Sequence, residues 1–257
     1  MKKGLFITLA LFGMFITLIA CSSDDNESPA PKHEDIVLTT GDTYLITDGG
    51  NWLSEEPLIA SITGNTITAE RVGVTRVYNE SSSFNVTVNP RHDLYDDPCM
   101  QWGASPAAVN SFMRGYTIMT QTSDMTIYQG KGAADFYSYS FENGQLASTV
   151  VYVNAGVYGY ALTDFLTERY VVIYVDEQEG VVGMVNIAED MAVFLTFTML
   201  GGEVYAMVVY MPYSYDGNQV NVKRILSSVP KGMSESMDTT PVEVVESVRE
   251  YIQRFKK

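Results

Sequence analysis

The sequence predicts a β-rich protein of two domains, a small N-terminal β-sandwich followed by an α+β domain built on an antiparallel sheet. From Asp35 to Asn89, short apolar stretches alternate with turn residues at the regular spacing typical of a sandwich. Beyond residue 99, a helix followed by three strands is predicted twice, at a displacement of 58 residues. An amphipathic helix over residues 241–256 closes the second domain.

Residues 1–20 have the pattern of a bacterial export signal. Lys2 and Lys3 precede an apolar stretch over residues 5–19, shorter than the roughly 18 residues of a membrane-spanning helix. The stretch ends in Leu18-Ile19-Ala20-Cys21, which resembles the lipobox of bacterial lipoproteins. The resemblance implies that Cys21 is the first mature residue and carries the lipid that attaches the protein to a membrane. The acidic tract over residues 22–27 is similar to the one that directs some Gram-negative lipoproteins to the outer face of the outer membrane.

The charge of the chain argues against a nucleic-acid partner. The formal net charge is −15, and removal of the signal takes away two lysines and no acid, which leaves −17. Such a surface repels phosphate backbones and favours solubility outside the cell. Residues 21–34 are rich in Ser, Asp, Pro and Ala without an apolar period, so we expect a lipidated flexible tether there.

Cysteine and histidine are too few for the common catalytic and metal sites. With lipid expected on Cys21, Cys99 has no intrachain partner, which excludes a disulfide framework. A nucleophilic Cys99 would need a base, and His33 and His92 are the only histidines, so a buried structural thiol is expected instead. Neither histidine has other ligands at metal-site spacing. The sequence therefore predicts a protein that is not an enzyme and uses no metal or cofactor.

Residues 35–90 carry the motifs of a recognisable sandwich. Gly41-Asp42-Thr43-Tyr44, the stretch Trp52 to Ile62 and the turn at Gly64-Asn65 follow one another in the order of the bacterial immunoglobulin-like domain of group 2, which this segment resembles. That family implies a stalk, spacer or adhesive module without catalytic residues. A lone Trp in a sandwich is usually a buried packing residue, so Trp52 is expected in the core. The less common alternative is an exposed ring on which a sugar stacks.

The second domain is predicted over residues 93–257, and its first residues overlap a short polar connector predicted at 91–98. Ser105-Pro106 has the pattern of an N-cap and first helical residue, and Gly115 ends that helix. Strands are expected at about 124–129, 135–142 and 145–153, with Asn143-Gly144 as a hairpin turn.

The same unit recurs further along the chain. The pattern Gly144-x-Leu146 to Val153 returns as Gly202-x-Val204 to Met211, and the same displacement carries Ser105 onto Thr163. A second helix is therefore expected at 163–169, followed by strands at 181–186 and 191–197. The arrangement resembles the beta-lactamase inhibitory proteins and the small outer-membrane assembly lipoproteins, whose hairpin motif is matched by residues 139–146. The doubling of the unit separates the chain from the assembly lipoproteins, so their role does not transfer.

The C-terminal helix is predicted to pack on the second domain. Thr240-Pro241-Val242-Glu243 has the pattern of a capping box with proline at the first helical position. An apolar stripe follows at Val245, Val248, Ile252 and Phe255. Amphipathic helices mostly cover the core of their own domain. The alternative is that this helix is free and binds a partner.

Aromatic residues give the only indication of a binding surface. Strand alternation and the limited cover of two short helices predict one functional or interdomain face, made of Tyr137, Tyr139, Phe141, Tyr205 and Met207. Its cover could be the sandwich, a protein or a glycan stacked on tyrosine. The leading hypothesis is an outer-membrane-anchored surface lipoprotein, facing the cell exterior, that acts in protein interaction or adhesion. The competing hypothesis is a glycan-binding lipoprotein of a polysaccharide uptake system.

Overall fold

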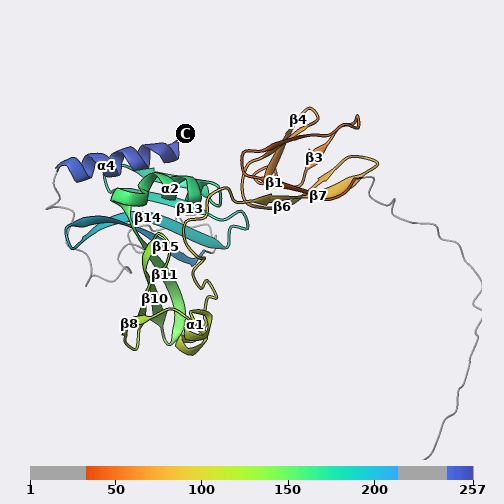
Figure 1. Ribbon diagram of the computed structural model, residues 1–257. Coiled ribbons are helices and arrows are strands. Elements are labelled where there is room, and N and C mark those ends of the chain that lie inside the picture. Colours follow the sequence, from red (N-terminus) through yellow and green to blue (C-terminus); the bar gives the residue numbers. More distant parts are fainter. Residues whose placement is uncertain (1–32, 214–241, 257) are drawn as a thin grey trace, which may run out of the picture. The chain divides into compact units, whose positions relative to one another are not determined.

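A computed structural model describes residues 33–213 and 242–256, and it is β-rich, with several sheets and few helices (Figure 1). The signal, Cys21 and most of the predicted tether lie outside the described residues, as do Thr240 and Pro241 of the predicted capping box.

Residues 36–89 form two small sheets packed as in a β-sandwich. The four-stranded sheet has the order β1 (Ile36–Thr39), β7 (Ser83–Asn89), β6 (Gly73–Tyr78), β3 (Leu53–Ser54). The three-stranded sheet has the order β2 (Thr43–Leu45), β5 (Thr66–Ala69), β4 (Ala60–Thr63). Strand β1 runs parallel to β7, and the other pairs are antiparallel.

The apolar residues of these strands face each other between the two sheets. In β7 the buried residues alternate as Phe84, Val86 and Val88, as period-two patterning requires. Trp52 is 4% exposed in the same core, which confirms its predicted packing role. The ring of His33 contacts the rings of both Trp52 and Phe84, so this residue of the predicted tether belongs to the sandwich.

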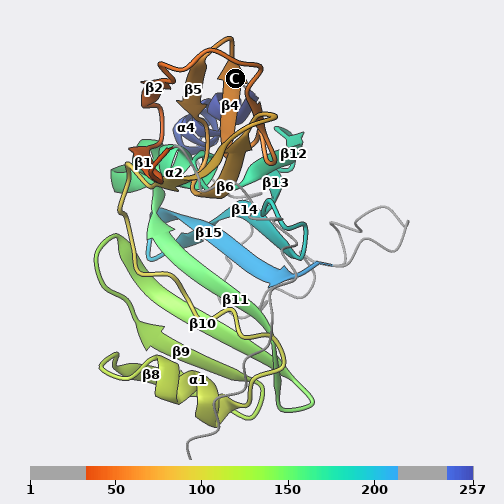
Figure 2. The ribbon, with the colours of Figure 1, turned by 90° about the vertical axis from the view of Figure 1, so that its right-hand side faces the viewer.

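The third sheet is an antiparallel sheet of eight strands. Its order is β12 (Val171–Asp176), β13 (Val181–Val185), β14 (Met191–Leu200), β15 (Glu203–Pro212), β11 (Gln145–Asn154), β10 (Ala134–Glu142), β9 (Met125–Gln129), β8 (Ile118–Gln121). Strands β11 and β15 lie side by side in its middle, and β8 and β12 form its two edges (Figure 2).

Each half of this sheet follows one helix. Helix α1 (Pro106–Phe112) begins after Ser105, whose hydroxyl accepts a hydrogen bond from the Ala108 N–H, and Pro106 is its first residue, as predicted. Helix α2 (Ala155–Thr167) begins eight residues before the predicted start at Thr163. Asn154 provides its cap, and the Thr163 hydroxyl donates to the Gly159 carbonyl inside the helix.

The two halves match each other, and each has four strands and not the three that were predicted. The edge strands β8 and β12 are the additional ones, and both contain a β-bulge, between Ile118 and Thr120 and between Val172 and Tyr174. The tips of the hairpins also correspond: Phe141 pairs with Leu146, and the residues 58 positions further along, Met199 and Val204, pair in the same way.

The predicted hairpin turn between β10 and β11 is confirmed. Asn143 has φ 52° and Gly144 has φ 74°, the left-handed conformation that a type I′ turn requires at both central residues. Gly201 and Gly202 occupy the corresponding turn in the second half, at φ 61° and 87°.

Helix α4 (Val242–Gln253), with the following turn η2 (Arg254–Lys256), packs on the sheet and on α2. Val248, Ile252 and Phe255 are buried in the larger core, as predicted from the apolar stripe, whereas the side chain of Val245 lies outside the described part. The contact with α2 is close: a Cβ added at Gly159 would lie 2.6 Å from the Tyr251 ring.

The predicted polar connector is part of the packing between helices and sheet. Tyr95 and Cys99 are buried in the core, and the Cys99 carbonyl accepts a hydrogen bond of 2.9 Å from the Thr149 hydroxyl. The Tyr95 hydroxyl lies 2.7 Å from that of Tyr210. Hence the segment after the sandwich lies along the sheet and covers it, although its composition is that of a linker.

Candidate functional site

The five residues predicted to form one aromatic face lie on opposite faces of the eight-stranded sheet. Tyr137, Tyr139 and Phe141 belong to the core beneath the helices, whereas Tyr205 and Met207 belong to a second apolar cluster. The register explains the separation, because Tyr137 lies opposite Val151, which in turn lies opposite Val208 and not Met207. The prediction of a single face is therefore wrong.

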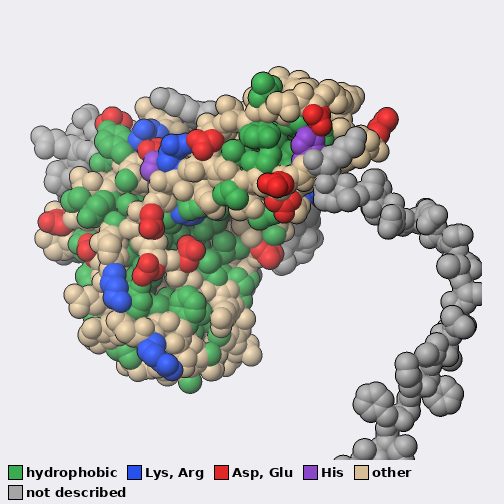
Figure 3. Space-filling model, turned by 45° about the vertical axis from the view of Figure 1, so that its right-hand side comes forward, with side chains coloured by type: hydrophobic (Ala, Val, Ile, Leu, Met, Phe, Trp, Pro, Cys, Tyr) green, Lys and Arg blue, Asp and Glu red, His purple; other side chains and the backbone are tan. Residues whose placement is uncertain are grey.

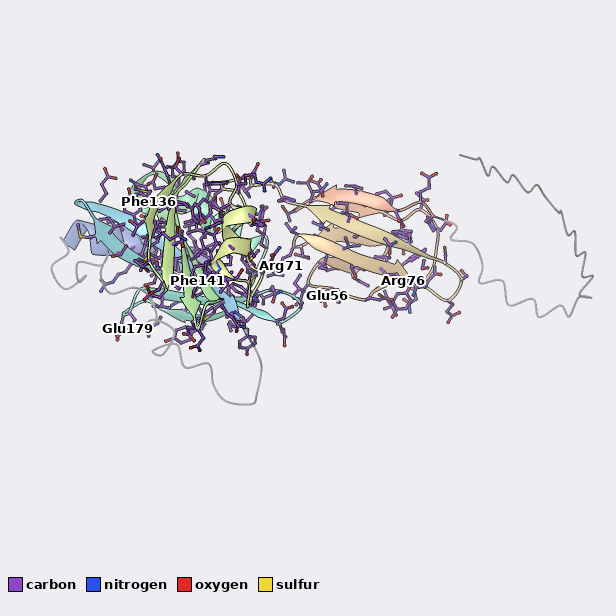
Figure 4. The ribbon with its side chains drawn as sticks, turned by 90° about the horizontal axis from the view of Figure 1, so that it is seen from below. Glu56, Arg71, Arg76, Phe136, Phe141 and Glu179 are labelled. Carbon is purple, nitrogen blue, oxygen red and sulfur yellow. The ribbon has the colours of Figure 1, made fainter. Side chains whose placement is uncertain are left out.

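The tyrosines of β10 are core residues that hold the connector. Tyr137 and Tyr139 are 1% and 0% exposed. The Tyr137 hydroxyl donates to the Asp96 carbonyl at 3.0 Å, and the Tyr139 oxygen accepts from the Cys99 N–H at 3.2 Å. Burial raises the pKa of both phenols well above the usual value, so they stay neutral at physiological pH. Figure 4 shows Phe136 and Phe141 on the same strand, with Phe136 packed against the second cluster.

The most densely bonded polar group in the described chain is the Glu168 carboxylate, at the end of α2. It accepts hydrogen bonds from the Thr40 hydroxyl at 2.8 Å and from the backbone N–H groups of Arg91 and His92, both at 3.0 Å. The Arg169 guanidinium forms an ion pair with its Oε1, and the His92 Nδ1 lies 3.2 Å from its Oε2. The Glu168 carboxylate thus bonds to the sandwich through Thr40, to the connector and to the neighbouring residue Arg169.

The charge of Glu168 is stabilised by these donors. Burial is the largest single effect and raises the pKa, but the hydrogen bonds from Thr40, His92, Arg91 and Arg169 together outweigh it, and the pKa is lowered. A buried carboxylate is retained in proteins when charge-assisted hydrogen bonds of this kind satisfy it. Both oxygens already have donors, which suits a structural joint rather than a general base.

Other contacts extend this joint, which we define as Glu168 and the residues bonded to it. The Val72 N–H of the sandwich donates to the Glu168 carbonyl at 2.8 Å, and Arg169 donates to the His92 carbonyl at 2.9 Å. Ile187, from the turn between β13 and β14, packs against the sandwich core. An open hollow of about 510 Å³ lies beside them, and its lining includes Glu56, which is labelled in Figure 4.

A second hollow, of about 430 Å³, lies between α2 and α4. Its lining is Tyr160, Asp164, Glu250, Gln253 and Arg254, a mixture of aromatic, carboxylate and amide groups. The Tyr160 hydroxyl donates to Glu250 at 2.6 Å, and the Arg254 guanidinium lies 4.8 Å from the centre of the Tyr160 ring. The polar and charged groups that line this hollow therefore largely bond to one another.

The two cysteines are the remaining residues for which the sequence predicted a role. Cys99 is fully buried, as expected of a structural thiol, whereas Cys21 lies outside the described residues.

Among residues 33–213 and 242–256, no group of three or more His, Cys, Asp or Glu side chains could hold a metal ion. In the same ranges no helix has both the length and the apolar character needed to span a membrane. On the face drawn in Figure 3, basic side chains lie together beside a histidine in one place and singly elsewhere.

No family model, curated protein or solved structure matches the chain.

Proposed function

We propose that the protein is a non-enzymatic surface lipoprotein, anchored in the outer membrane by lipid on Cys21, which presents an interaction module to the cell exterior. The sequence Leu18-Ile19-Ala20-Cys21 and the acidic tract after it support the anchor. The partner is a protein, and the negative surface disfavours nucleic acid.

The finer architecture belongs to the same proposal. Residues 35–90 form an immunoglobulin-like domain of the group 2 bacterial type, and residues 93–257 form a duplicated α+β domain similar to the beta-lactamase inhibitory proteins. Support for the duplication comes from the hairpin tips, which pair in the same way at a displacement of 58 residues, since a repeated unit retains such features.

The single observation that carries the presentation role is the joint at Glu168. A spacer presents a module best when it cannot swing freely, because ordering a mobile module on binding costs affinity. Here Thr40 and Val72 of the sandwich, which follows the tether, and Arg91 of the connector all donate hydrogen bonds to Glu168, just after α2. We infer that the sandwich acts as a stiff spacer.

A glycan-binding role is the second candidate, and the hollow between α2 and α4 favours it. Its tyrosine, carboxylates and amide are groups that bind sugar hydroxyls and ring faces. Arg254, however, lies over the Tyr160 ring, where a sugar would have to stack. Protein interaction therefore remains the first choice.

The anchor is tested by the variant Cys21→Ala with Cys99→Ala as the matched control. We expect Cys21→Ala to lose labelling by a lipid precursor and to leave the membrane fraction, whereas Cys99→Ala retains both properties. Membrane retention and lipid labelling of Cys21→Ala would refute the lipoprotein proposal.

A further inference from the structure

The second apolar cluster of the eight-stranded sheet is buried, although the described part of the chain provides no layer that packs on it. Helices α2 and α4 lie together on the other side of the sheet (Figure 1), and the apolar residues that the described helices bury belong to the larger core there. The buried members of the second cluster all come from strands of this one sheet: Val150 and Tyr152 of β11, Val181 of β13, Ala192 and Phe194 of β14, and Met207 and Val209 of β15. Because side chains stand roughly perpendicular to a sheet, a second layer is needed to bury their ends.

Burial is nearly complete across the centre of this face, and it includes polar atoms. Val150, Val209 and Phe194 lie in one row across β11, β15 and β14, and each is 1% exposed. Ser138 lies opposite Val150 on the same face, and its hydroxyl and that of Tyr152 are buried without a hydrogen-bond partner in the described part of the chain. A layer with polar groups among its apolar side chains suits these hydroxyls better than the hydrocarbon of a lipid.

The chain leaves the sheet from the middle of this face. Strand β15 has β14 and β13 on one side and β11 and β10 on the other, and all five strands contribute to the cluster. Tyr213, which follows β15 and is the last described residue before Val242, packs against the cluster. At up to about 3.3 Å per residue, residues 214–241 can cross several strands spaced about 4.8 Å apart.

Residues 214–241 also contain the side chains that such a layer needs. Within them, residues 220–229 read Val-Asn-Val-Lys-Arg-Ile-Leu-Ser-Ser-Val, in which apolar and polar side chains are mixed. Residues 21–32, by contrast, contain no Val, Ile, Leu, Met or aromatic residue. They lead to His33, whose ring packs in the sandwich and not on this sheet.

We propose that residues 220–229 pack on the second apolar cluster and form the second layer on this face of the sheet. The occupant is thus a segment of the same chain, and the cluster is not available to another molecule. The interaction surface of the protein then lies elsewhere. The proposal does not depend on the lipid anchor.

Cysteine labelling tests whether the purified full chain covers this face by itself. Met207→Cys, on the central strand of the cluster, should react with a maleimide at least about tenfold more slowly than Ile173→Cys, which replaces a half-exposed residue. Peptide mass spectrometry reads each position separately from Cys21 and Cys99. Labelling of Met207→Cys as fast as that of Ile173→Cys would overturn the proposal, because the face would then be open in the isolated chain.

A double replacement in the segment identifies the occupant. Changing Ile225 and Leu226 together to Ser should accelerate labelling of Met207→Cys by at least about tenfold, because the layer loses its apolar contacts. Val208→Cys, the neighbouring residue on the helix face, is the matched control and should stay slow in both chains. Unchanged slow labelling of Met207→Cys after the double replacement would contradict the assignment of residues 220–229.

Disulfide trapping decides the question if the double replacement unfolds the protein and exposes both positions. Met207→Cys is combined in turn with Val222→Cys, Ile225→Cys and Val229→Cys, and at least one pair should oxidise to a disulfide within a single chain. Linked peptides from the monomer band of a non-reducing gel identify it. The same three partners combined with Val208→Cys should give no such link. Absence of a link in all three pairs with Met207→Cys would overturn the proposal, as would a link that forms only between two chains.

Discussion

Glu168 is the residue on which the arrangement around the sandwich most depends. Its carboxylate is 7% exposed and meets donors from positions as far apart in sequence as Thr40 and Arg169. No sequence pattern indicated this role, because a Glu-Arg pair at the end of a helix is ordinary and its partners are distant along the chain. The connector was predicted, but its bonds to Glu168 were missed for a similar reason, since the backbone groups of Arg91 and His92 make them whatever their side chains are.

Replacing Glu168 by Gln removes the charge but keeps the shape. An amide nitrogen then faces N–H donors, and charge-assisted bonds are lost, so the free energy of unfolding should fall by about 2 to 3 kcal/mol. Urea unfolding measures this change. The control is Asp164→Asn, whose Arg254 partner lies 3.8 Å away in a partly exposed pair, and it should change the same quantity by less than about 1 kcal/mol. Equal effects of the two variants would contradict the special role of Glu168.

The pH dependence follows from the lowered pKa of Glu168. Its stabilising effect is fully present above the ordinary value of 4.5 and is lost as the pH falls through the lower pKa of the folded state. The difference in unfolding free energy between the wild type and Glu168→Gln should therefore shrink from about pH 6 to about pH 3. Urea unfolding of both proteins across this range measures it. A difference that stays constant or grows would be inconsistent with an ionised Glu168.

Tyr139 should behave as a core residue and not as part of a binding face. Tyr139→Ser removes a fully buried ring and leaves the Cys99 N–H without its acceptor, so we expect a loss of about 3 to 5 kcal/mol in unfolding free energy. Tyr174→Ser, at an exposed position of β12, should cost less than about 1 kcal/mol. Thermal and urea unfolding compare the two variants, and a small effect at Tyr139 would return that residue to the candidate surface.

At the scale of elements, α2 and α4 pack at Gly159. A Gly-to-Ala change in a helix normally stabilises it by up to about 1 kcal/mol. At Gly159 the added methyl would meet the Tyr251 ring at 2.6 Å, so Gly159→Ala should instead destabilise the protein by about 1 to 3 kcal/mol. Gly156→Ala, whose methyl would come no closer than 3.4 Å to Asn154, should be neutral or stabilising. If both variants were stabilising, α4 would not pack there as described.

Elements with strong local signals were predictable. The Ser105 cap, the Asn143-Gly144 turn and the apolar stripe of α4 each depend on neighbouring residues, and the structure confirms all three. The exposed edge strand β8 was missed because its sequence Ile-Met-Thr-Gln has no alternation. The start of α2 was misplaced because Asn154 ends β11 and caps the helix directly, with no turn between.

The whole molecule depends on contacts between distant parts of the chain, and here the sequence was least informative. Whether Tyr137 and Met207 lie on the same face of the sheet is decided by the register of three strands, and a shift of one residue would reverse the outcome. The central claim at this scale is that the sandwich is held to the eight-stranded sheet by the joint at Glu168.

The distance between spin labels on the sandwich and on the large sheet tests this claim most directly. Labels on Val37→Cys in β1 and Ile173→Cys in β12, both at least half exposed, are suitable in the Cys21→Ala chain because Cys99 is buried. Pulsed electron spin resonance should give one narrow distance distribution, which broadens when Glu168→Gln is added. A distribution that is already broad without that change would contradict the account, because the sandwich would then move independently of the sheet.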